Sequence, residues 1–573
     1  MADSEARASV FMNRRIRNRT SGGVGGRRGW KHPRLLPDAT SPVHDGRFFA
    51  PHRKRLDQGF GPMSPVRPIL LALWATLVGA VAQESAVGLT DRLAGLQLAR
   101  RHCVTCHLFP DPAAADLKTW REEILPRMKY RLGFSSPELE RSTNIAILRQ
   151  HHRIPLQPVL TEAEWMTLSR FYFAEAPKTP RPQPEHEAIS LGGTPFRVVI
   201  PELRLAQQSI SAVAIDAQRK EIWIGEDNTR SLHRLSASGA LLETLSLSNT
   251  PARIRLESGG TLQVTGIGLL PPNDLEAGAL LRVDRNRKGA PAIPTETLLQ
   301  SLRRPVDAVS ADFDGDGRPE WIVAEFGNHL GALSHHQPQG SAWKRRELFP
   351  LPGAVSLQTT DFDRDGRADV LALIAQETES LLLFRNDGRG GFERRTLLQK
   401  PPQWGFSHVT TADFNGDGWP DVLVCNGDNG EFNSPPKGYH GVRLYLADRQ
   451  GALTEHWSYP LHGAYGARAG DFDGDGDLDI AAISYFPDYA QNPREGFVYF
   501  QNLGNGSFRP STIRECIAGR WMALDSGDLD GDGDLDLVLG SYTHGPTEVP
   551  EFLMKTWDSS RIPILILLNT TRR

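Results

Sequence analysis

The chain of 573 residues is longer than one ordinary domain, so its length indicates two domains or more. Its formal net charge of -3 at pH 7 argues against nucleic acid as a partner, and four cysteines are too few for a disulfide scaffold. The 54 glycines and 41 prolines suit a turn-rich β body.

The first 82 residues carry two different patterns. Residues 1–62 are rich in Arg and Gly without an apolar period, which predicts a disordered basic extension, either an over-called start or a true cytoplasmic extension. Residues 63–82 begin at Met63, continue through a short apolar run and end in small residues at Ala80–Ala82, as a secretory signal peptide does. We expect a bacterial protein that is periplasmic or otherwise exported, with no membrane span after cleavage; an uncleaved anchor is the alternative.

The segment Arg101–Pro110 contains Cys-Val-Thr-Cys-His. At this spacing two thiols add across the vinyl groups of a porphyrin and the adjacent histidine ligates its iron, so Cys103 and Cys106 are the predicted thioethers and His107 the proximal ligand. A redox Cys-x-x-Cys favours a βαβ context, and a zinc half-site needs further Cys or His ligands that are absent nearby. Export agrees with one covalent haem c, because haem is attached outside the cytoplasm.

The segments on either side of this motif have helical patterns. Thr90 is a suitable N-cap for a helix that leads into the motif, and Thr161 with Glu164 forms a capping box before a second helix. These segments resemble the first and last helices of class I cytochromes c. The resemblance implies a small all-α cytochrome c domain over residues 88–178.

The sixth iron ligand is predicted to be Met128. It lies two residues after Pro126, in a stretch that we expect to be non-helical, where such a methionine usually lies in these cytochromes. Met166 is the rival, but its helical spacing suggests packing, and His151 and His152 are further candidates. Methionine ligation raises the potential and fills the site, which favours electron transfer over chemistry at iron.

An Asp-rich nonapeptide recurs about every 50 residues in the second half of the chain, and each copy precedes a short apolar run. The five copies begin at Asp312, Asp361, Asp413, Asp471 and Asp528. A period near 50 with several short strands per unit is typical of a propeller blade rather than of a helical solenoid.

The spacing of oxygen ligands in these copies predicts calcium. Side chains at positions 1, 3, 5 and 9 converge on one hard cation, glycine permits the turn, and position 7 contributes its carbonyl. Up to five calcium ions are expected, in a structural role, because metal neutralises the buried acidic groups. The predicted site residues are Asp312, Asp314, Asp316, Arg318 and Glu320; Asp361, Asp363, Asp365, Arg367 and Asp369; Asp413, Asn415, Asp417, Trp419 and Asp421; Asp471, Asp473, Asp475, Asp477 and Asp479; and Asp528, Asp530, Asp532, Asp534 and Asp536.

Two other interpretations of the acidic loops fit poorly. An EF-hand requires a bidentate Glu at position 12 and flanking helices, whereas the chain has Val323, Ala372, Val424, Ala482 and Leu539 there, within apolar β runs. Solvated acidic turns do not explain five matched copies.

These copies resemble FG-GAP repeats, also called VCBS repeats, which form the blades of the integrin alpha-subunit propeller. The resemblance covers residues 195–573, and Phe384–Phe392 and Phe500–Phe508 match the family's turn between later strands. Two upstream segments look like blades without metal loops. The resemblance implies an all-β seven-bladed propeller over residues 193–573, closed by a strand at residues 193–203 that joins the last blade.

The propeller face opposite the metal loops is the predicted ligand face, because long aromatic loops and the loops before the first strands gather there. Either packing at the blade tops or contact with a flat ligand, a sugar or a partner explains these side chains. The candidates are Trp404, His408, Tyr465, Arg468, Arg520 and Trp521. Cys425 and Cys516 are expected to be free and buried, with a disulfide as the alternative.

The whole chain resembles exported bacterial proteins that join a c-type cytochrome domain to an FG-GAP propeller. We expect an electron-transfer protein whose propeller binds a redox partner protein or a small-molecule ligand. One alternative is a periplasmic oxidoreductase that oxidises a sugar or alcohol and passes electrons to the haem. Another is an adhesion or scaffold module. The chain has no recognisable catalytic motif, so its catalytic residues stay unassigned and enzymatic activity stays open.

Overall fold

The structure, a computed structural model, describes residues 88–141, 143–257, 260–285, 296–430 and 435–572. The predicted basic extension and signal peptide lie outside these residues. Within them, no helix is both long and apolar enough to cross a membrane.

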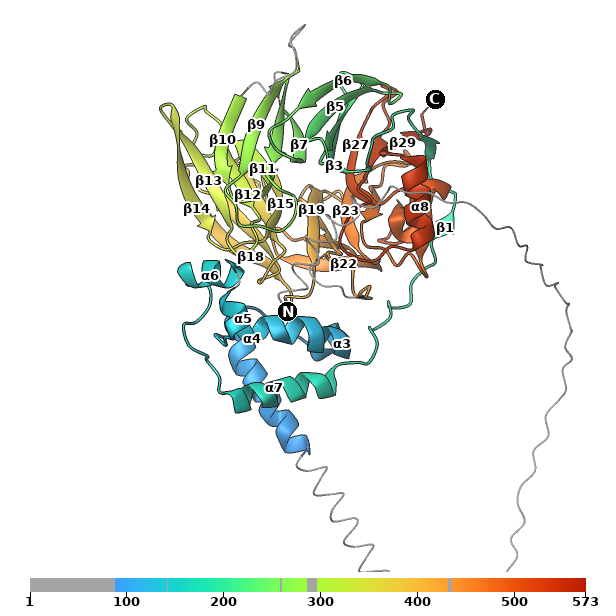
Figure 1. The fold of residues 1–573 in the computed structure, drawn as a ribbon. Helices are drawn as coiled ribbons and strands as arrows, with labels where there is room; N and C mark the ends of the chain where they lie inside the picture. Colours follow the sequence, from blue (N-terminus) through green and yellow to red (C-terminus); the bar gives the residue numbers. More distant parts are fainter. Residues whose placement is uncertain (1–87, 142, 258–259, 286–295, 431–434, 573) are drawn as a thin grey trace, which may run out of the picture. The chain divides into compact units, whose positions relative to one another are not determined.

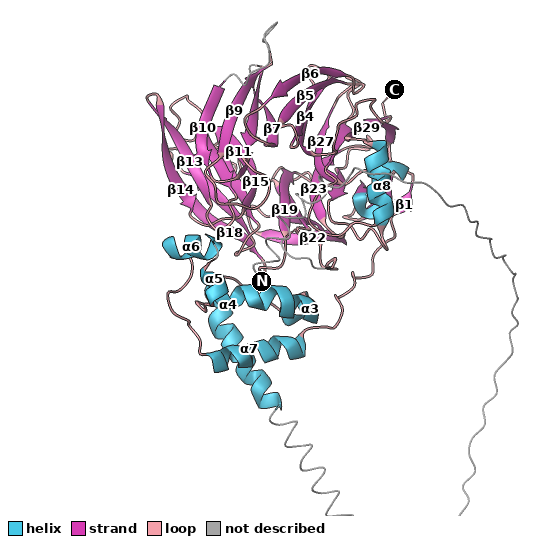
Figure 2. Ribbon diagram, in the orientation of Figure 1, coloured by secondary structure: helices cyan, strands magenta, loops and turns pink. Residues whose placement is uncertain are grey.

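Helices make up the N-terminal part of the described chain (Figure 2). A helix covers residues 88–102. The elements that follow are η1 (Cys103–Thr105), η2 (Pro112–Ala114), α3 (Leu117–Thr119), the π-helix η3 (Trp120–Ile124), α4 (Leu125–Arg131), α5 (Pro137–Glu140), α6 (Thr143–Gln150) and α7 (Glu162–Glu175). The capping box predicted at the start of α7 is confirmed, since Glu164 N–H bonds the Thr161 hydroxyl and the Glu164 carboxylate accepts the Thr161 N–H.

Met128 lies within α4, so the expectation of a non-helical stretch around it is wrong. Pro126 suggested a break, but it falls in the first turn of α4, where a proline's missing N–H is tolerated. The π-helix η3 runs directly into α4, because the Leu125 N–H bonds the Trp120 carbonyl.

Seven separate sheets follow, six with four strands and one with five (Figure 1). Blades one to three are β3 (Ile210–Asp216), β4 (Glu221–Glu226), β5 (Ser231–Ser236) and β6 (Leu241–Ser246); β7 (Pro251–Glu257), β8 (Thr261–Gly266), β9 (Gly278–Asp284) and β10 (Glu296–Leu302); and β11 (Pro305–Ala311), β12 (Glu320–Glu325), β13 (Ala332–Gln339) and β14 (Ala342–Phe349). Blades four and five are β15 (Ala354–Thr360), β16 (Asp369–Ile374), β17 (Ser380–Asn386) and β18 (Phe392–Gln399); and β19 (Phe406–Ala412), β20 (Asp421–Asn426), β21 (Gly441–Ala447) and β22 (Leu453–Pro460).

The last two blades each take a strand from the segment before blade one. Blade six contains β23 (Ala464–Gly470), β24 (Asp479–Ser484), β25 (Phe497–Asn502) and β26 (Phe508–Thr512), with β1 (Ser190–Leu191) parallel to β26. Blade seven contains β27 (Trp521–Gly527), β28 (Asp536–Ser541) and β29 (Ile564–Asn569), with β2 (Phe196–Val199) antiparallel to β29. The short helices η4 (Pro493–Gly496), η5 (Arg514–Ile517) and α8 (Glu551–Ser560) lie in the connecting loops. The fold is a seven-bladed all-β propeller.

The first strand of every blade has the same irregularity. All seven shift register after their first paired residue, as between Pro305 and Asp307 or between Phe406 and His408. A bulge of this kind strengthens the local twist of a strand. The repeated bulge therefore marks the seven first strands as equivalent positions around one ring.

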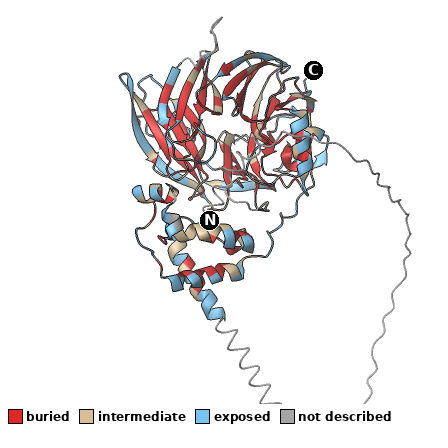
Figure 3. Cartoon of the chain, viewed as in Figure 1, coloured by how far each residue is buried: buried red, intermediate tan, exposed pale blue. Residues whose placement is uncertain are grey.

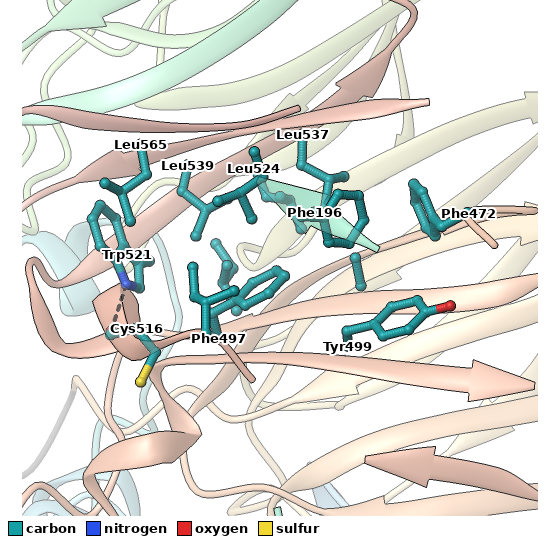
Figure 4. Packing of buried hydrophobic residues seen from close by; sticks show 14 of the residues in the cluster. Phe196, Phe472, Phe497, Tyr499, Cys516, Trp521, Leu524, Leu537, Leu539 and Leu565 are labelled. Atoms are coloured by element: carbon teal, nitrogen blue, oxygen red, sulfur yellow. Dashed lines mark hydrogen bonds between the residues drawn. The ribbon is translucent and has the colours of Figure 1, made fainter. Parts of the chain in front are cut away.

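Apolar side chains between adjacent blades form the cores, and burial follows the strands (Figure 3). One core joins blade one to blade seven through Ile210 and Ile224 on one side and Val538 and Ile566 on the other, so the ring is closed by packing. Another core joins blades six and seven around Trp521, Phe497 and Tyr499 (Figure 4). Phe196 of β2 lies 5.5 Å from Phe472 in this core, measured between ring centroids.

Candidate functional site

Each Asp-rich loop joins the first strand of a blade to the second, in blades three to seven. In four of these loops three carboxylates lie within 4.8 Å of one another; the groups are Asp312, Asp314 and Asp316; Asp361, Asp363 and Asp365; Asp471, Asp473 and Asp479; and Asp528, Asp530 and Asp536. In blade five Asn415 takes position 3, and the Asp417 N–H bonds both Asp413 Oδ1 (3.1 Å) and Asn415 Oδ1 (2.9 Å). Carboxylates and amide oxygens are the ligands that calcium prefers.

The position-9 carboxylates are fully buried and fix the shape of their loops. In blade six, Asp479 accepts the N–H of Phe472, at position 2 of its own loop, and the N–H of Asn502, at the end of the third strand. Four blades repeat this pair of bonds, through Asp369, Asp421, Asp479 and Asp536. The loop is therefore positioned by its own blade before any ion binds.

Burial and the neighbouring loop carboxylates raise the pKa of these position-9 groups. The pKa of Asp369, of Asp479 and of Asp536 is raised to about 6, with burial as the main cause. The pKa values of Asp421 and Glu320 are raised for the same main reason. A divalent cation would remove this electrostatic cost, so the donor set and its charge fit calcium.

Position 7 was predicted to use its carbonyl, and its side chains differ accordingly between loops. Arg318 pairs with the neighbouring Asp316 at 2.6 Å, and Arg367 pairs with Asp365. Trp419 lies under the guanidinium of Arg364, 5.5 Å from it. These exposed contacts leave the carbonyl of position 7 as the group that the five loops have in common.

Blades one and two lack the acidic loop, and arginine takes the place of a cation there. Asp216, at the end of β3, forms an ion pair with Arg285 in which both side chains are almost fully buried. Glu257, at the end of β7, accepts a hydrogen bond from Arg282 Nε at 3.0 Å. The charge at the end of the first strand is thus balanced by a side chain in these two blades.

The Cys-Val-Thr-Cys-His motif lies at the end of the first helix and includes η1. The Nδ1 atom of His107 is 2.8 Å from the Leu108 carbonyl, and because a carbonyl only accepts, Nδ1 must carry the proton. The lone pair is then on Nε2, and burial lowers the pKa of His107, which favours the neutral ring. This is the tautomer in which a histidine ligates a metal.

The two cysteines of the motif are free thiols in different surroundings. Cys106 is exposed, whereas Cys103 packs against an aromatic core that includes Trp120 and Tyr172, whose ring centroids lie 4.2 Å apart. Burial raises the pKa of Cys103 to about 11, which disfavours the thiolate that a redox or zinc cysteine needs. Met128 packs against the same core. The residues present therefore fit a haem better than they fit the two alternatives.

The six candidates for the ligand face divide into separate groups. Trp404 stacks on Tyr439, and two cations, Lys400 and Arg443, lie 4.9 and 4.7 Å from its ring. Trp521 is fully buried in the core between blades six and seven and donates to the Cys516 carbonyl at 2.7 Å (Figure 4). Its role in the structure is packing, because no part of it faces solvent.

Tyr465 and Arg520 lie together in an aromatic cluster with Tyr485, Phe486 and Tyr542. The Arg520 guanidinium carbon is 4.0 Å from the Tyr485 ring centroid, and its Nε and Nη2 atoms donate to the carbonyls of Tyr485 and Pro546. Arg520 is fully buried, so it braces the long loops of blades six and seven rather than projecting from them.

His408 and Arg468 lie on first strands, not on the loops of the predicted face. Arg468 Nη1 donates to His408 Nε2 at 3.1 Å, and Arg468 Nε donates to Asp525 at 3.3 Å. Sequence reasoning missed the charged residues that accompany them, Arg253, Arg255, Asp307 and Asp525. A usable signal was present, since charges alternate within otherwise apolar strands such as Pro251–Glu257.

Cys425 and Cys516 are free and buried, as expected. Burial raises the pKa of Cys425 to about 12, so this thiol is inert at neutral pH.

Comparison with protein families identifies the Asp-rich loops as parts of a known type of repeat. A family model described as an FG-GAP-like repeat matches residues 312–372, 361–424 and 486–539. Among solved structures, a candidate 6-phosphogluconolactonase from Bacteroides uniformis ATCC 8492 is 10% identical, with a TM-score of 0.36 over 53% of this chain and 85% of that chain. A likeness of that size says nothing about activity. The chain contains FG-GAP repeats, and they are built into a seven-bladed β-propeller.

Proposed function

We propose that the protein is an exported electron-transfer protein with one covalent haem c, whose calcium-stabilised propeller binds a redox partner or a ligand. The observation that carries the proposal is the Cys-Val-Thr-Cys-His motif at the end of a helix, with Cys103 packed in an aromatic core. The hydrogen bond from His107 Nδ1 to the Leu108 carbonyl supports it, because it leaves Nε2 available to iron.

Cys103 and Cys106 would hold the haem through thioether bonds, and His107 and Met128 would ligate its iron. When bound, the haem supplies a one-electron couple, which methionine ligation holds at a high potential. The chain's own contribution is to exclude water: Trp120, Tyr172 and their neighbours form a buried core beside Cys103. Burial of this kind tunes the potential of a haem.

The propeller would serve recognition rather than electron transfer. Its acidic loops would bind calcium and stiffen one face, while long loops on the other face would present binding groups. Propellers with FG-GAP repeats are consistent with ligand or partner binding. Trp404, flanked by Lys400 and Arg443, is the aromatic group of the predicted face best suited to contact an anionic or flat partner.

Replacement of Met128 tests the ligand assignment. The variant Met128→Ala should lose the charge-transfer band of thioether-ligated iron and show a lower midpoint potential. Met166→Ala is the matched control, because Met166 lies on α7 with 54% of its surface exposed. An unchanged spectrum in Met128→Ala, or loss of the band in Met166→Ala, would contradict the assignment.

A reduction screen separates a carrier from an enzyme. The purified oxidised protein is mixed with a panel of sugars and alcohols, and haem reduction is followed by absorbance. An electron carrier stays oxidised until a protein donor is added. Reduction by a member of the panel would instead favour an oxidoreductase that oxidises the compound on the propeller.

A further inference from the structure

Six charged or titratable side chains gather on the first strands of the propeller, outside the metal loops. Each first strand contacts the next around the ring, from β3 through β7, β11, β15, β19 and β23 to β27 and back to β3. The side chains come from five of these strands, and we call them the axial cluster: Arg253, Arg255, Asp307, His408, Arg468 and Asp525.

Both carboxylates of the axial cluster are fully paired. Asp307, which is completely buried, accepts three bonds from Arg255 at 2.9, 2.9 and 3.1 Å and the N–H of Leu357 at 3.0 Å. Asp525 accepts from Arg468 at 3.3 Å and from the N–H of Ile215 at 2.9 Å. The two N–H groups belong to β15 and β3. Each carboxylate is paired with one arginine, Asp307 with Arg255 and Asp525 with Arg468.

Arg253 is the third guanidinium and has no carboxylate of its own. Its one bond to Asp307 is long, at 3.5 Å, and Asp307 is already held by Arg255. The pKa of Arg468 is lowered by burial and further by Arg253 and Arg255, although Asp525 opposes the effect. The cluster therefore carries one net positive charge in a partly desolvated position.

His408 adds a hydrogen-bond donor without an acceptor. A guanidinium only donates, so His408 Nε2 accepts from Arg468 and Nδ1 must carry the proton. That Nδ1 atom is buried and has no partner among the described residues, and the side chain as a whole is 6% exposed. A buried N–H without an acceptor is unfavourable, because it has lost its hydrogen bond to water, so such a group calls for a partner such as a water or an ion.

We propose that the axial cluster binds a small oxyanion, a carboxylate or phosphate group, with Arg253 and the Nδ1–H of His408 as its donors. One anion supplies both missing elements, the negative charge that Arg253 lacks and the acceptor that His408 lacks. A guanidinium fork matches the geometry of carboxylate and phosphate oxygens. A water molecule would satisfy His408 but would leave the surplus charge in place. This site goes beyond the proposed electron transfer and does not depend on the haem.

The test is titration calorimetry of the calcium-loaded full-length protein, desalted to remove free calcium. Inorganic phosphate and acetate are titrated separately at constant ionic strength, with chloride as the background anion. Each experiment is repeated on Arg253→Gln, His408→Asn and the control Arg449→Gln, in which an exposed arginine on a distant turn is changed. Thermal unfolding of each protein with and without the anion provides the second measurement.

The proposal predicts saturable binding of phosphate, acetate or both to the wild type and to Arg449→Gln, with a raised melting temperature. Binding should weaken at least ten-fold in Arg253→Gln and in His408→Asn. Which anion binds identifies the group that the site takes. Absence of saturable binding of either anion to the wild type would overturn the proposal, and so would equal binding in the two axial variants. Failure here would leave the haem proposal untouched, since that is read from the absorption spectrum.

Discussion

The carboxylate at position 9 of each metal loop has a structural role in its blade and also belongs to the predicted set of cation ligands. All five are buried, and four of them accept backbone N–H groups from their own loop and from the end of the third strand, as Asp479 does with Phe472 and Asn502. Each also directs its charge at the acidic loop. We therefore expect a carboxylate at this position to serve the strand ends as well as a bound cation, whereas the exposed position-5 carboxylate accepts an N–H only within the loop, as Asp475 does from Asp477.

The variant Asp479→Asn should lower the free energy of unfolding in calcium by about 2 kcal/mol or more, because its amide cannot accept all the bonds of the carboxylate and binds calcium less well. Urea unfolding with and without a chelator measures the effect. Asp387→Asn is the control, since Asp387 is an exposed carboxylate that caps a turn outside the metal loops. If chelation destabilises wild type and Asp479→Asn equally, Asp479 is not a ligand.

The buried side chain of His336 should make the free energy of unfolding depend on pH. Burial is the main reason that its pKa in the folded protein is lowered to about 4; Glu325 opposes the shift and Arg345 adds to it, and His335 lies beside it in sequence. The unfolded chain, with a pKa of 6.5, takes up the proton first as the pH falls. The stability contributed by neutral His336 is therefore present above pH 6.5 and is lost as the pH falls towards 4.

Chemical unfolding in calcium at pH 7 and pH 5 measures this contribution. Wild type should lose about 2 kcal/mol more between the two pH values than His336→Gln does. Equal losses in the two proteins would show that His336 is accessible to protons in the folded state.

Individual elements show where sequence reasoning succeeds and where it fails. The capping box of α7 is local, so Thr161 and Glu164 were sufficient to predict it. The helix around Met128 was missed because the π-helix before it accommodates Pro126, and a π-helix has no simple sequence signal. Trp521 was assigned to a ligand face because an aromatic residue at the start of a strand looks the same in sequence whether it packs or binds. The axial cluster was missed because its partners come from different blades.

The strand β2 completes the fourth position of blade seven, so its packing should contribute to the stability of the ring. Phe196→Ala should lower the free energy of unfolding by about 3–5 kcal/mol, because it opens a cavity beside Phe472 and Tyr499. Phe552→Ala on α8 is the control, since Phe552 is 62% exposed and its loss should cost less than about 0.5 kcal/mol. Equal, small losses in urea unfolding would mean that β2 is dispensable.

In the molecule as a whole, packing between the first and last blades closes the ring, and charged groups follow the first strand of each blade. Packing joins blade one to blade seven, while five blades carry acidic loops and the other two have arginine ion pairs at the end of the first strand. Removal of calcium should therefore destabilise blades three to seven first, through repulsion among the loop carboxylates.

Chelation should lower the melting temperature of the propeller by several degrees and leave the haem absorption spectrum intact, because the predicted haem ligands and the metal loops share no residue. Calorimetry and absorbance on one sample measure both. Re-addition of calcium, but not of magnesium at equal concentration, should restore stability. A melting temperature unchanged by the chelator would contradict the calcium assignment.

Whether one chain carries a covalent haem together with this propeller is tested by mass spectrometry of the intact protein. The protein is produced in a bacterial host that attaches c-type haem in its periplasm, and then denatured. We expect one haem per chain that remains bound after denaturation and is absent from the double variant Cys103→Ala, Cys106→Ala. A wild-type chain whose mass is that of the polypeptide alone would contradict it.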